Sequence, residues 1–279
     1  MQELPELLIE PGRAEKNYWR DLWRYRELFY FLAWRDILVR YKQTVIGIAW
    51  AVIRPLLTSF VLVFVFNKIG KLPAPPGVSY FLFVLAANLP WQFFATAMSE
   101  ASNSLIGNSN LISKIYFPRL VVPAGAVITS FVDFLITLGL LAVTMIYFQF
   151  MPGWQLATLP LFVLLAFGAA FGIGLWLSAL NVEYRDFRYI VPFIVQFGMY
   201  ISPVGFGSAD VASKGVVLYS LYSLNPMVGV IEGFRWSLLA GKTPLDVQAV
   251  LTSVAVVFLL LVSGVWYFRK MERTFADVI

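Results

Sequence analysis

Residues 134–182 read FLITLGLLAVTMIYFQFMPGWQLATLPLFVLLAFGAAFGIGLWLSALNV, a run of 49 residues without a charged side chain. A helix needs about 20 residues to cross the hydrocarbon core of a membrane, so this run is too long for one span and suits two. Pro152 and Gly153 lie near its middle and favour a tight turn at 151–154. The stretch therefore predicts a membrane protein with one span at about 120–150 and another at about 158–180.

Apolar runs on either side of this stretch extend the pattern. The fold class they predict is an all-α polytopic membrane protein with six transmembrane helices, because four further spans are expected. These lie at about 46–67, 78–99, 189–206 and 247–268. The chain then divides into an N-terminal region 1–44, a transmembrane domain 45–270 and a tail 271–279.

Composition excludes most familiar catalytic sites. The chain is 59% hydrophobic and only 13% charged, and it contains no cysteine and no histidine. A disulfide framework, a thiolate nucleophile, a Cys/His zinc site and a histidine base are therefore all excluded. We predict no catalytic residue and no metal site in this chain.

The positions of the basic residues set the expected orientation. With six spans and the N-terminus inside, 15 Lys and Arg residues fall on the cytoplasmic side and five on the outer side. This bias follows the positive-inside rule and predicts that both termini are cytoplasmic. Membrane topology accounts for the net charge of +5, so no nucleic-acid partner is expected.

Residues 17–42 form the clearest amphipathic pattern. At helical spacing, aromatic and apolar side chains gather on one side and charged ones oppose them, although Arg26 and Arg40 break the rule. Such a helix lies in the membrane interface. It is either a lever that touches a cytoplasmic partner or a plain anchor. Its marker residues are Trp19, Trp23, Trp34, Arg35 and Asp36.

Two cytoplasmic loops have unusual compositions. Residues 101–113 are polar but uncharged and lead into Lys114, Tyr116 and Arg119. This composition fits a short helix docked into another protein, or else one packed on the chain's own helix ends. The second loop, 181–188, is short and dense in charge.

The region 207–246 is apolar but interrupted. Asn225 and Pro226 divide it, and Glu232 and Arg235 lie in its second half. Each half is too short to span, so we expect a re-entrant pair of helices at 215–240 dipping in from the outer face. A loop on the membrane surface is the alternative.

Two charged residues fall inside expected spans. Burying a charge at membrane depth costs a few kcal/mol, so Arg54 and Asp133 are expected to face a cavity or a partner. Arg54 can also snorkel to the headgroups. Asp133 either lies on a pathway, pairs with Arg54, or makes a hydrogen bond between helices.

Several strings, in order along the chain, resemble one family. RDILVRYKQTVIGIAW (35–50) is followed by Arg54-Pro55-Leu56, NLISKIYFPR (110–119), NVEYRDFR (181–188), YISPV (200–204), and Asn225-Pro226 leading to EGFR (232–235). This series resembles the permease subunits of bacterial ABC-2 type polysaccharide exporters. The matching strings are distributed over roughly 35–236, which is most of the chain.

The resemblance implies a homodimer in the bacterial cytoplasmic membrane, joined to two copies of a separate ATPase. The ATPase would use ATP and Mg, and this chain would bind no cofactor. The substrate would be a lipid-linked, O-antigen-like polysaccharide moving through a channel between two copies of the first and fifth spans, and membrane lipid would be the other partner.

Roles for individual residues follow from the same resemblance. Residues 103–116 would be a coupling helix seated in the ATPase, and 181–188 a second contact. The coupling residues would be Asn110, Lys114, Tyr116, Phe117, Arg119, Tyr184, Arg185 and Asp186. Aromatic and polar groups along the substrate path would be Trp50, Arg54, Asp133, Phe197, Tyr200, Ser202 and Phe206.

Other functions remain open at the level of sequence. An ABC-2 exporter of a small lipid or drug would share the topology. A stand-alone channel or secondary carrier would need no ATPase, so the 103–116 segment would have no evident function. A membrane enzyme is the least favoured class, because the chain has neither an Asp-x-Asp pair nor a histidine–acid motif. Co-purification with an ATPase separates the ABC exporters from the other classes.

Overall fold

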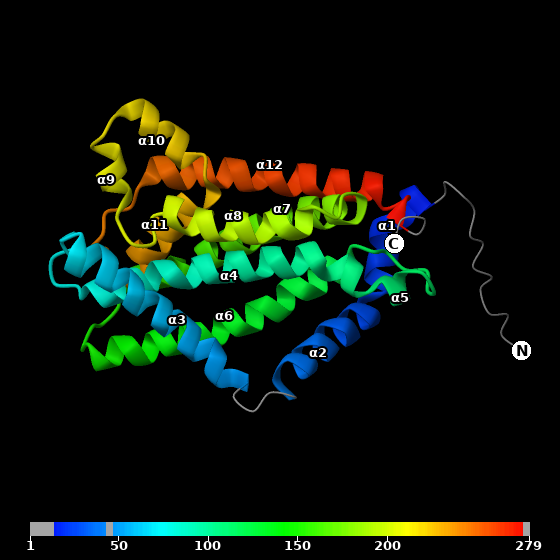
Figure 1. Ribbon diagram of the computed structural model, residues 1–279, viewed down its shortest axis with the longest axis horizontal. Coiled ribbons are helices and arrows are strands. Elements are labelled where there is room, and N and C mark those ends of the chain that lie inside the picture. Colours follow the sequence, from blue (N-terminus) through cyan, green and yellow to red (C-terminus); the bar gives the residue numbers. More distant parts are fainter. Residues whose placement is uncertain (1–13, 43–46, 276–279) are drawn as a thin grey trace, which may run out of the picture.

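The computed structural model describes residues 14–42 and 47–275, and every regular element within these ranges is a helix (Figure 1). Five of the described helices are long and apolar enough to cross a membrane. They are α3 (Gly47–Val63) with its π-helical continuation η1 (Phe64–Ile69), α4 (Tyr80–Gly107), α6 (Val121–Tyr147), α7 (Leu159–Glu183) and α12 (Val247–Met271). Three segments lie outside the described ranges, namely 1–13, 43–46 and 276–279. They include parts of the predicted N-terminal region and of the predicted tail.

Helix α4 is the centre of the bundle, where it packs against α3, α6, α7, α8 and α11. In its most apolar window 83% of residues are buried, against 22% for α12. Yet the mean hydropathy of α4 is the lowest of the five at 1.4, and that of α12 is the highest at 2.4. A helix enclosed by protein can carry polar side chains that bond to neighbouring helices, whereas a lipid-facing helix must stay apolar.

Asn88 illustrates this polar interior. Its amide is fully buried in α4 and donates to the Pro55 carbonyl, at 3.2 Å, and to Ser59 Oγ, at 3.0 Å. Both acceptors belong to α3. The contact therefore joins α3 to the central helix by satisfied hydrogen bonds.

The turn predicted inside the quoted run is confirmed. α6 ends at Tyr147 and α7 begins at Leu159, within three residues of the predicted limits at both ends of each span. Between them, the short 3-10 turn η2 (Trp154–Thr158) leads into α7. Pro152 and Gly153, which both disfavour helix, thus lie between the two helices as predicted.

Two glycines bring α7 and α12 into backbone contact. A Cβ atom on Gly172 would lie 2.9 Å from the Leu260 carbonyl carbon, and one on Gly264 would lie 2.6 Å from the Gly172 carbonyl oxygen. Contacts this close require glycine on both helices. Small residues are the usual means of close helix approach in membranes, where packing replaces the hydrophobic driving force.

Helix α8 (Phe187–Ile201) is shorter than the predicted span 189–206. Its 15 residues extend about 22 Å, less than the roughly 30 Å of a hydrocarbon core. After Ile201 the chain turns and continues into α9 (Ser208–Ala212), α10 (Val216–Ser223) and α11 (Pro226–Leu238). These three lie at one end of the bundle (Figure 1).

The interrupted region is helical, and its second half is buried. Asn225 caps α11 by accepting from the Met227 amide at 3.0 Å, and Pro226 occupies the first turn, where its missing N–H costs nothing. α11 packs against α4, α7 and α12. The alternative of a surface loop therefore does not hold for α11.

The N-terminal segment differs from the single helix expected over 17–42. It forms α1 (Ala14–Arg24) and α2 (Arg26–Lys42), and α2 packs against α6. The expected coupling helix 103–116 is also different, since 103–107 are the end of α4 and α5 covers only Ser109–Ile112. α1, α5 and the end of α12 lie at the end of the bundle opposite α9 and α10 (Figure 1).

Candidate functional site

The residues predicted for a substrate path fall in three separate places. Trp50, Arg54 and Asp133 line one cavity, Phe197 and Tyr200 lie on the exposed face of α8, and Ser202 and Phe206 belong to the loop at the α9 end. They do not form one continuous surface within a single chain.

The cavity, which we call the lateral cavity, has a volume of about 490 Å³ and lies between α2, α3, α4 and α6. Charged and amide side chains line it beside aromatic ones, which is unusual for the side of a membrane bundle. Its lining includes Arg40, Tyr41, Trp50, Arg54, Gln92, Phe93, Glu100 and Asp133.

Asp133 pairs with Arg40, so the alternative of a pair with Arg54 was wrong. Arg40 Nη1 lies 2.5 Å from Asp133 Oδ2, and Arg40 Nη2 lies 2.7 Å from Glu100 Oε1. The Tyr41 hydroxyl donates to the other oxygen of Asp133. Arg40 therefore bridges α4 and α6 from the last turn of α2, and the charge of Asp133 is compensated from outside its own helix.

The same helix has a second anchor nearer its start. Arg35 binds Asp36 at 2.7 Å and donates to Asn108 Oδ1 at 2.9 Å. Arg35 contacts Asn108, just after the end of α4, whereas Arg40 contacts Glu100, eight residues earlier in the chain. Eight residues correspond to about 12 Å along a helix axis. α2 thus slopes into the bundle, whereas the sequence pattern predicted a helix in the plane of the interface.

Helix α8 carries an exposed row of aromatic rings. Tyr189, Phe193, Phe197 and Tyr200 follow one another at spacings of four, four and three, which places them on one face of the helix. Each is at least 49% exposed, and the rings of Phe193 and Phe197 are 4.2 Å apart. The row, which we call the α8 aromatic row, extends the two predicted residues to four.

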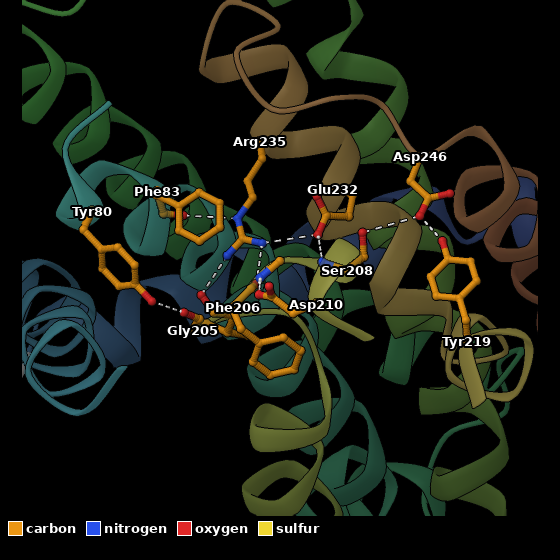
Figure 2. A network of polar contacts seen from close by, with 12 residues as sticks. Tyr80, Phe83, Gly205, Phe206, Ser208, Asp210, Tyr219, Glu232, Arg235 and Asp246 are labelled. Carbon is orange, nitrogen blue, oxygen red and sulfur yellow. Dashed lines mark hydrogen bonds and ion pairs between the residues drawn. The ribbon is translucent and has the colours of Figure 1, made fainter. Parts of the chain in front are cut away.

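The loop that contains Ser202 and Phe206 is held by a buried arginine (Figure 2). Arg235 on α11 has no exposed surface and donates to the carbonyls of Val204 at 2.9 Å, Phe206 at 2.8 Å and Phe83 at 3.2 Å. Its guanidinium also stacks on the Phe83 ring, 3.6 Å from the centroid. One cation thereby ties the loop to α4 and α11.

Acidic side chains complete this network. Glu232 Oε1 lies 3.3 Å from Arg235 Nη1 and accepts from the Ser208 amide at 2.9 Å. Asp246, the N-cap of α12, accepts from Ser208 Oγ at 3.4 Å and from the Tyr219 hydroxyl. Figure 2 shows these groups as one connected cluster.

Ser202 has a structural role in this loop. It is fully buried, and its Oγ accepts from Asn225 Nδ2 at 2.9 Å. Phe206 is partly buried and lies beside Phe66 and Tyr222, with ring centroids 6.1 and 6.4 Å away. Neither residue faces the lateral cavity or the α8 aromatic row.

The predicted coupling residues share one end of the molecule but differ in exposure. Asn181 at the end of α7 donates to the Ser102 carbonyl at 2.9 Å, so the two loops start from neighbouring helix ends. Phe117 is only 3% exposed, and the Arg119 amide donates to Glu272 Oε1 at 2.7 Å. Those two hold the end of the bundle. The exposed members are Asn110, Lys114, Tyr116, Tyr184, Arg185 and Asp186.

The tryptophans of the N-terminal segment point outward. Trp19, Trp23 and Trp34 are 58%, 72% and 49% exposed, whereas Leu32 and Ala33 form the buried contact of α2. Exposed tryptophan rings are typical of the headgroup level of a membrane. Ala33 belongs to the apolar face that the sequence pattern predicted, but the tryptophans of that face lie outside the contact.

Comparison with known proteins identifies the family. The profile of the ABC-2 type transporter family matches residues 27–239. The chain belongs to the ABC-2 type transporter family. It is similar to the O-antigen export system permease protein RfbA of Myxococcus xanthus, at 26% identity over 260 residues that cover 93% of this chain and 98% of that protein. The protein of the same name from Klebsiella pneumoniae is 26% identical over 246 residues, covering 88% and 92%.

Membership in the ABC-2 family makes this chain a multi-pass permease, and it implies a partner ATPase subunit. The structure also gives a physical role to the family string at 232–235. Glu232 and Arg235 are the centre of the buried network, and a Cβ on Gly233 would meet the Phe162 ring at 2.1 Å. Residues 232–235 therefore supply contacts that hold one end of the permease bundle together.

Three features of the permease escaped sequence reasoning. Arg40 and Tyr41 compensate Asp133, and the one available signal was that Arg40 broke the amphipathic pattern. Tyr189 and Phe193 were detectable from their four-residue spacing ahead of Phe197. Arg235 was recognised as an interruption of an apolar run and as part of a family string, but nothing local shows which distant carbonyls it will reach.

Proposed function

We propose that this ABC-2 permease is the channel-forming subunit of an ATP-driven exporter of a lipid-linked, O-antigen-like polysaccharide. It would act as a homodimer with two copies of a separate ATPase in the bacterial cytoplasmic membrane. ATP and Mg would be used by the ATPase, so this chain would be no enzyme and bind no cofactor. The names of its relatives support the class of substrate.

The α8 aromatic row is the observation that carries this proposal. Rings exposed along a helix offer flat apolar surfaces on which sugar rings can stack. Stacking is weak and does not depend on a fixed set of hydrogen bonds, so a polymer can move from one ring to the next. A run of buried hydrogen-bond partners would instead trap a long polar chain.

A dimer would enclose this row. α3 has only 17% of its most apolar window buried, and α8 leaves its aromatic face uncovered within one chain. Two copies that meet along α3 and α8 would cover these faces and leave the rings along the seam. A seam that parts would give a continuous channel, which a long polymer requires.

The lateral cavity is where we place the lipid-linked end of the substrate. It opens beside α2 and contains Arg54, whose guanidinium can bind a phosphate with two parallel hydrogen bonds. Arg40 is bound to Glu100 and Asp133 in the same cavity. An incoming phosphate would compete with those carboxylates and loosen the hold of α2 on the bundle.

We further propose six spans with both termini in the cytoplasm, α8 being the short fifth span, α1 lying in the interface and 215–240 being re-entrant from outside. The domains would then be 1–44, 45–270 and 271–279. The end of the bundle with α1, α5 and the α7–α8 turn carries Lys114, Arg119, Arg185, Arg269 and Lys270. Such a concentration of cations supports a cytoplasmic position, where the ATPase would bind.

Replacing the aromatic row tests the proposal directly. The double variant Phe197→Leu/Tyr200→Leu keeps α8 apolar and helical but removes two flat faces. We expect the amount of polymer at the cell surface to fall at least tenfold, with normal levels of the permease in the membrane and normal co-purification of the ATPase.

A matched pair on other helices serves as the control. Tyr147→Leu/Phe258→Leu removes one Tyr and one Phe that are 81% and 64% exposed on α6 and α12. We expect export by this variant to equal that of the wild type. Full export by the α8 variant, or an equal loss in both variants, would show that the aromatic row does not carry the polymer.

A further inference from the structure

A second cavity lies between α1, the 116–119 segment and the last three turns of α12, at the end of the bundle that we propose to be cytoplasmic. Its volume is about 1280 Å³, more than twice that of the lateral cavity. Neither the family nor the proposed polymer path assigns it a task. We call it the α1–α12 cavity.

The wall that α12 contributes changes character along its length. Leu261 and Val262 come first, Val265 and Trp266 lie one turn on, and Arg269 and Lys270 follow after another turn. Residues four apart lie on the same helix face, so these pairs form one stripe. The stripe is apolar where α12 lies in the membrane and cationic where α12 ends.

The charges at the open end are predominantly positive. Four cationic side chains line the cavity, Arg119, Arg269, Lys270 and Arg273, against the two carboxylates Asp21 and Glu272. Glu272 is already engaged, because it accepts from the Arg119 amide at 2.7 Å. Burial also raises the pKa of the Glu272 carboxyl.

Aromatic rings hold two of these cations in place. Arg269 Cζ lies 4.6 Å from the centre of the Tyr18 ring, and Lys270 Nζ lies 5.5 Å from that of Trp266. Trp266 is 61% exposed and marks the boundary between the apolar and cationic parts of the stripe. Tryptophan at such a boundary is typical of the headgroup level.

We infer that the α1–α12 cavity binds an anionic phospholipid, with its acyl chains along Leu261, Val262 and Val265 and its phosphate at Arg269 and Lys270. Basic pockets between helices at the cytoplasmic membrane face are known to take anionic headgroups. A soluble anion would occupy only the cationic half of the stripe, whereas a single lipid molecule would contact both halves.

The site has a consequence for the proposed ATPase contact. Tyr116, Phe117 and Arg119 form the opposite wall of the cavity, and the exposed Lys114 and Tyr116 belong to the same segment. A lipid wedged between this segment and α12 would help to fix the position of the surface offered to the ATPase. Export would then require anionic lipid in the inner leaflet.

Native mass spectrometry of the full-length permease, released from nanodiscs of phosphatidylglycerol and phosphatidylcholine in equal amounts, tests the inference. We expect retained phosphatidylglycerol on the wild type. The variant Arg269→Gln/Lys270→Gln should retain roughly tenfold to thirtyfold less, since each cation near the surface contributes about 1 kcal/mol to anionic-lipid binding. The charge-preserving variant Lys270→Arg should retain phosphatidylglycerol. Retention by this variant shows that a substitution in the cavity does not by itself abolish lipid binding.

The matched control is Arg24→Gln/Lys42→Gln, which removes two exposed cations of α1 and α2 that do not line the cavity. It should bind lipid as the wild type does. Equal retention of the two lipids, equal loss in the control, or full retention by Arg269→Gln/Lys270→Gln would overturn the inference. So would displacement by millimolar glycerol phosphate, which indicates a soluble-anion site, or by the ATPase subunit, which indicates a protein interface.

Discussion

Arg235 shows how much of one end of the bundle depends on a single residue. Its guanidinium donates to three carbonyls and is fully buried, so each bond is made in a medium that offers no water as a substitute. Arginine suits this position because its donors are fixed in a planar fork. A lysine would keep the charge but cannot reach three carbonyls in these directions.

We therefore predict that Arg235→Lys destabilises the permease by about 2 kcal/mol or more, since hydrogen bonds to a charged group contribute about 1.5–3 kcal/mol each. The thermal unfolding midpoint of the detergent-solubilised chain measures this. The same replacement at the exposed Arg188 should leave the midpoint unchanged. Equal midpoints for the two variants would mean that the 202–208 loop does not depend on Arg235.

Individual contacts were the hardest part to predict from sequence. The cost of a charge at depth correctly indicated that Asp133 needs a partner, and it suggested Arg54 as the candidate inside a neighbouring span. The partner is Arg40, from a helix that the sequence placed in the interface plane. The pairing depends on how α2 slopes against α4 and α6, and no local pattern encodes that angle.

At the scale of the helix, the α7–α12 contact depends on glycine. Gly172 and Gly264 allow the two backbones to touch, and any side chain at Gly172 would have to displace α12. The predicted variant is Gly172→Leu, for which overpacking costs typically 1–3 kcal/mol. The thermal midpoint of the solubilised chain should fall accordingly.

Gly139 in α6 provides the matched comparison, because a Cβ atom there would meet nothing within 4 Å. Both positions lie inside helices, so Gly→Leu brings the same gain in helix propensity, about 1 kcal/mol, at each. The difference between Gly172→Leu and Gly139→Leu then isolates the helix contact. A midpoint for Gly172→Leu as high as that for Gly139→Leu would contradict the close approach.

Helix positions along the chain were predictable, whereas their arrangement was not. Charge-free runs and the Pro152-Gly153 turn located α6 and α7 within three residues. Hydropathy did not reveal that α4 is central, because the least apolar of the five long helices is the most buried. Hydropathy also predicted too long a fifth span. The apolar residues after Ile201, where α8 ends, belong to a loop whose carbonyl groups accept hydrogen bonds from Arg235.

At the scale of the whole molecule, the two ends of the bundle differ in what they expose. The end with α9 and α10 is closed by the buried Arg235 network, while the opposite end presents Lys114, Tyr116 and Tyr184 to solvent. A partner subunit needs exposed anchors of this kind. The family implies a partner ATPase, and the cytoplasmic position that we propose for the α5 end favours ATPase binding at these anchors.

Reversing a charge and removing an aromatic ring at that end should weaken the complex. For Lys114→Glu/Tyr116→Ala we predict at least a tenfold loss of ATPase affinity, because truncating a central interface anchor costs more than about 1.4 kcal/mol. Co-purification of the ATPase and stimulation of its activity by the reconstituted permease are the measurements. The control, Lys214→Glu/Tyr147→Ala, makes the same two changes at exposed positions near the other end, and it should bind the ATPase normally. If both variants bind the ATPase equally well, the contact lies elsewhere on the permease.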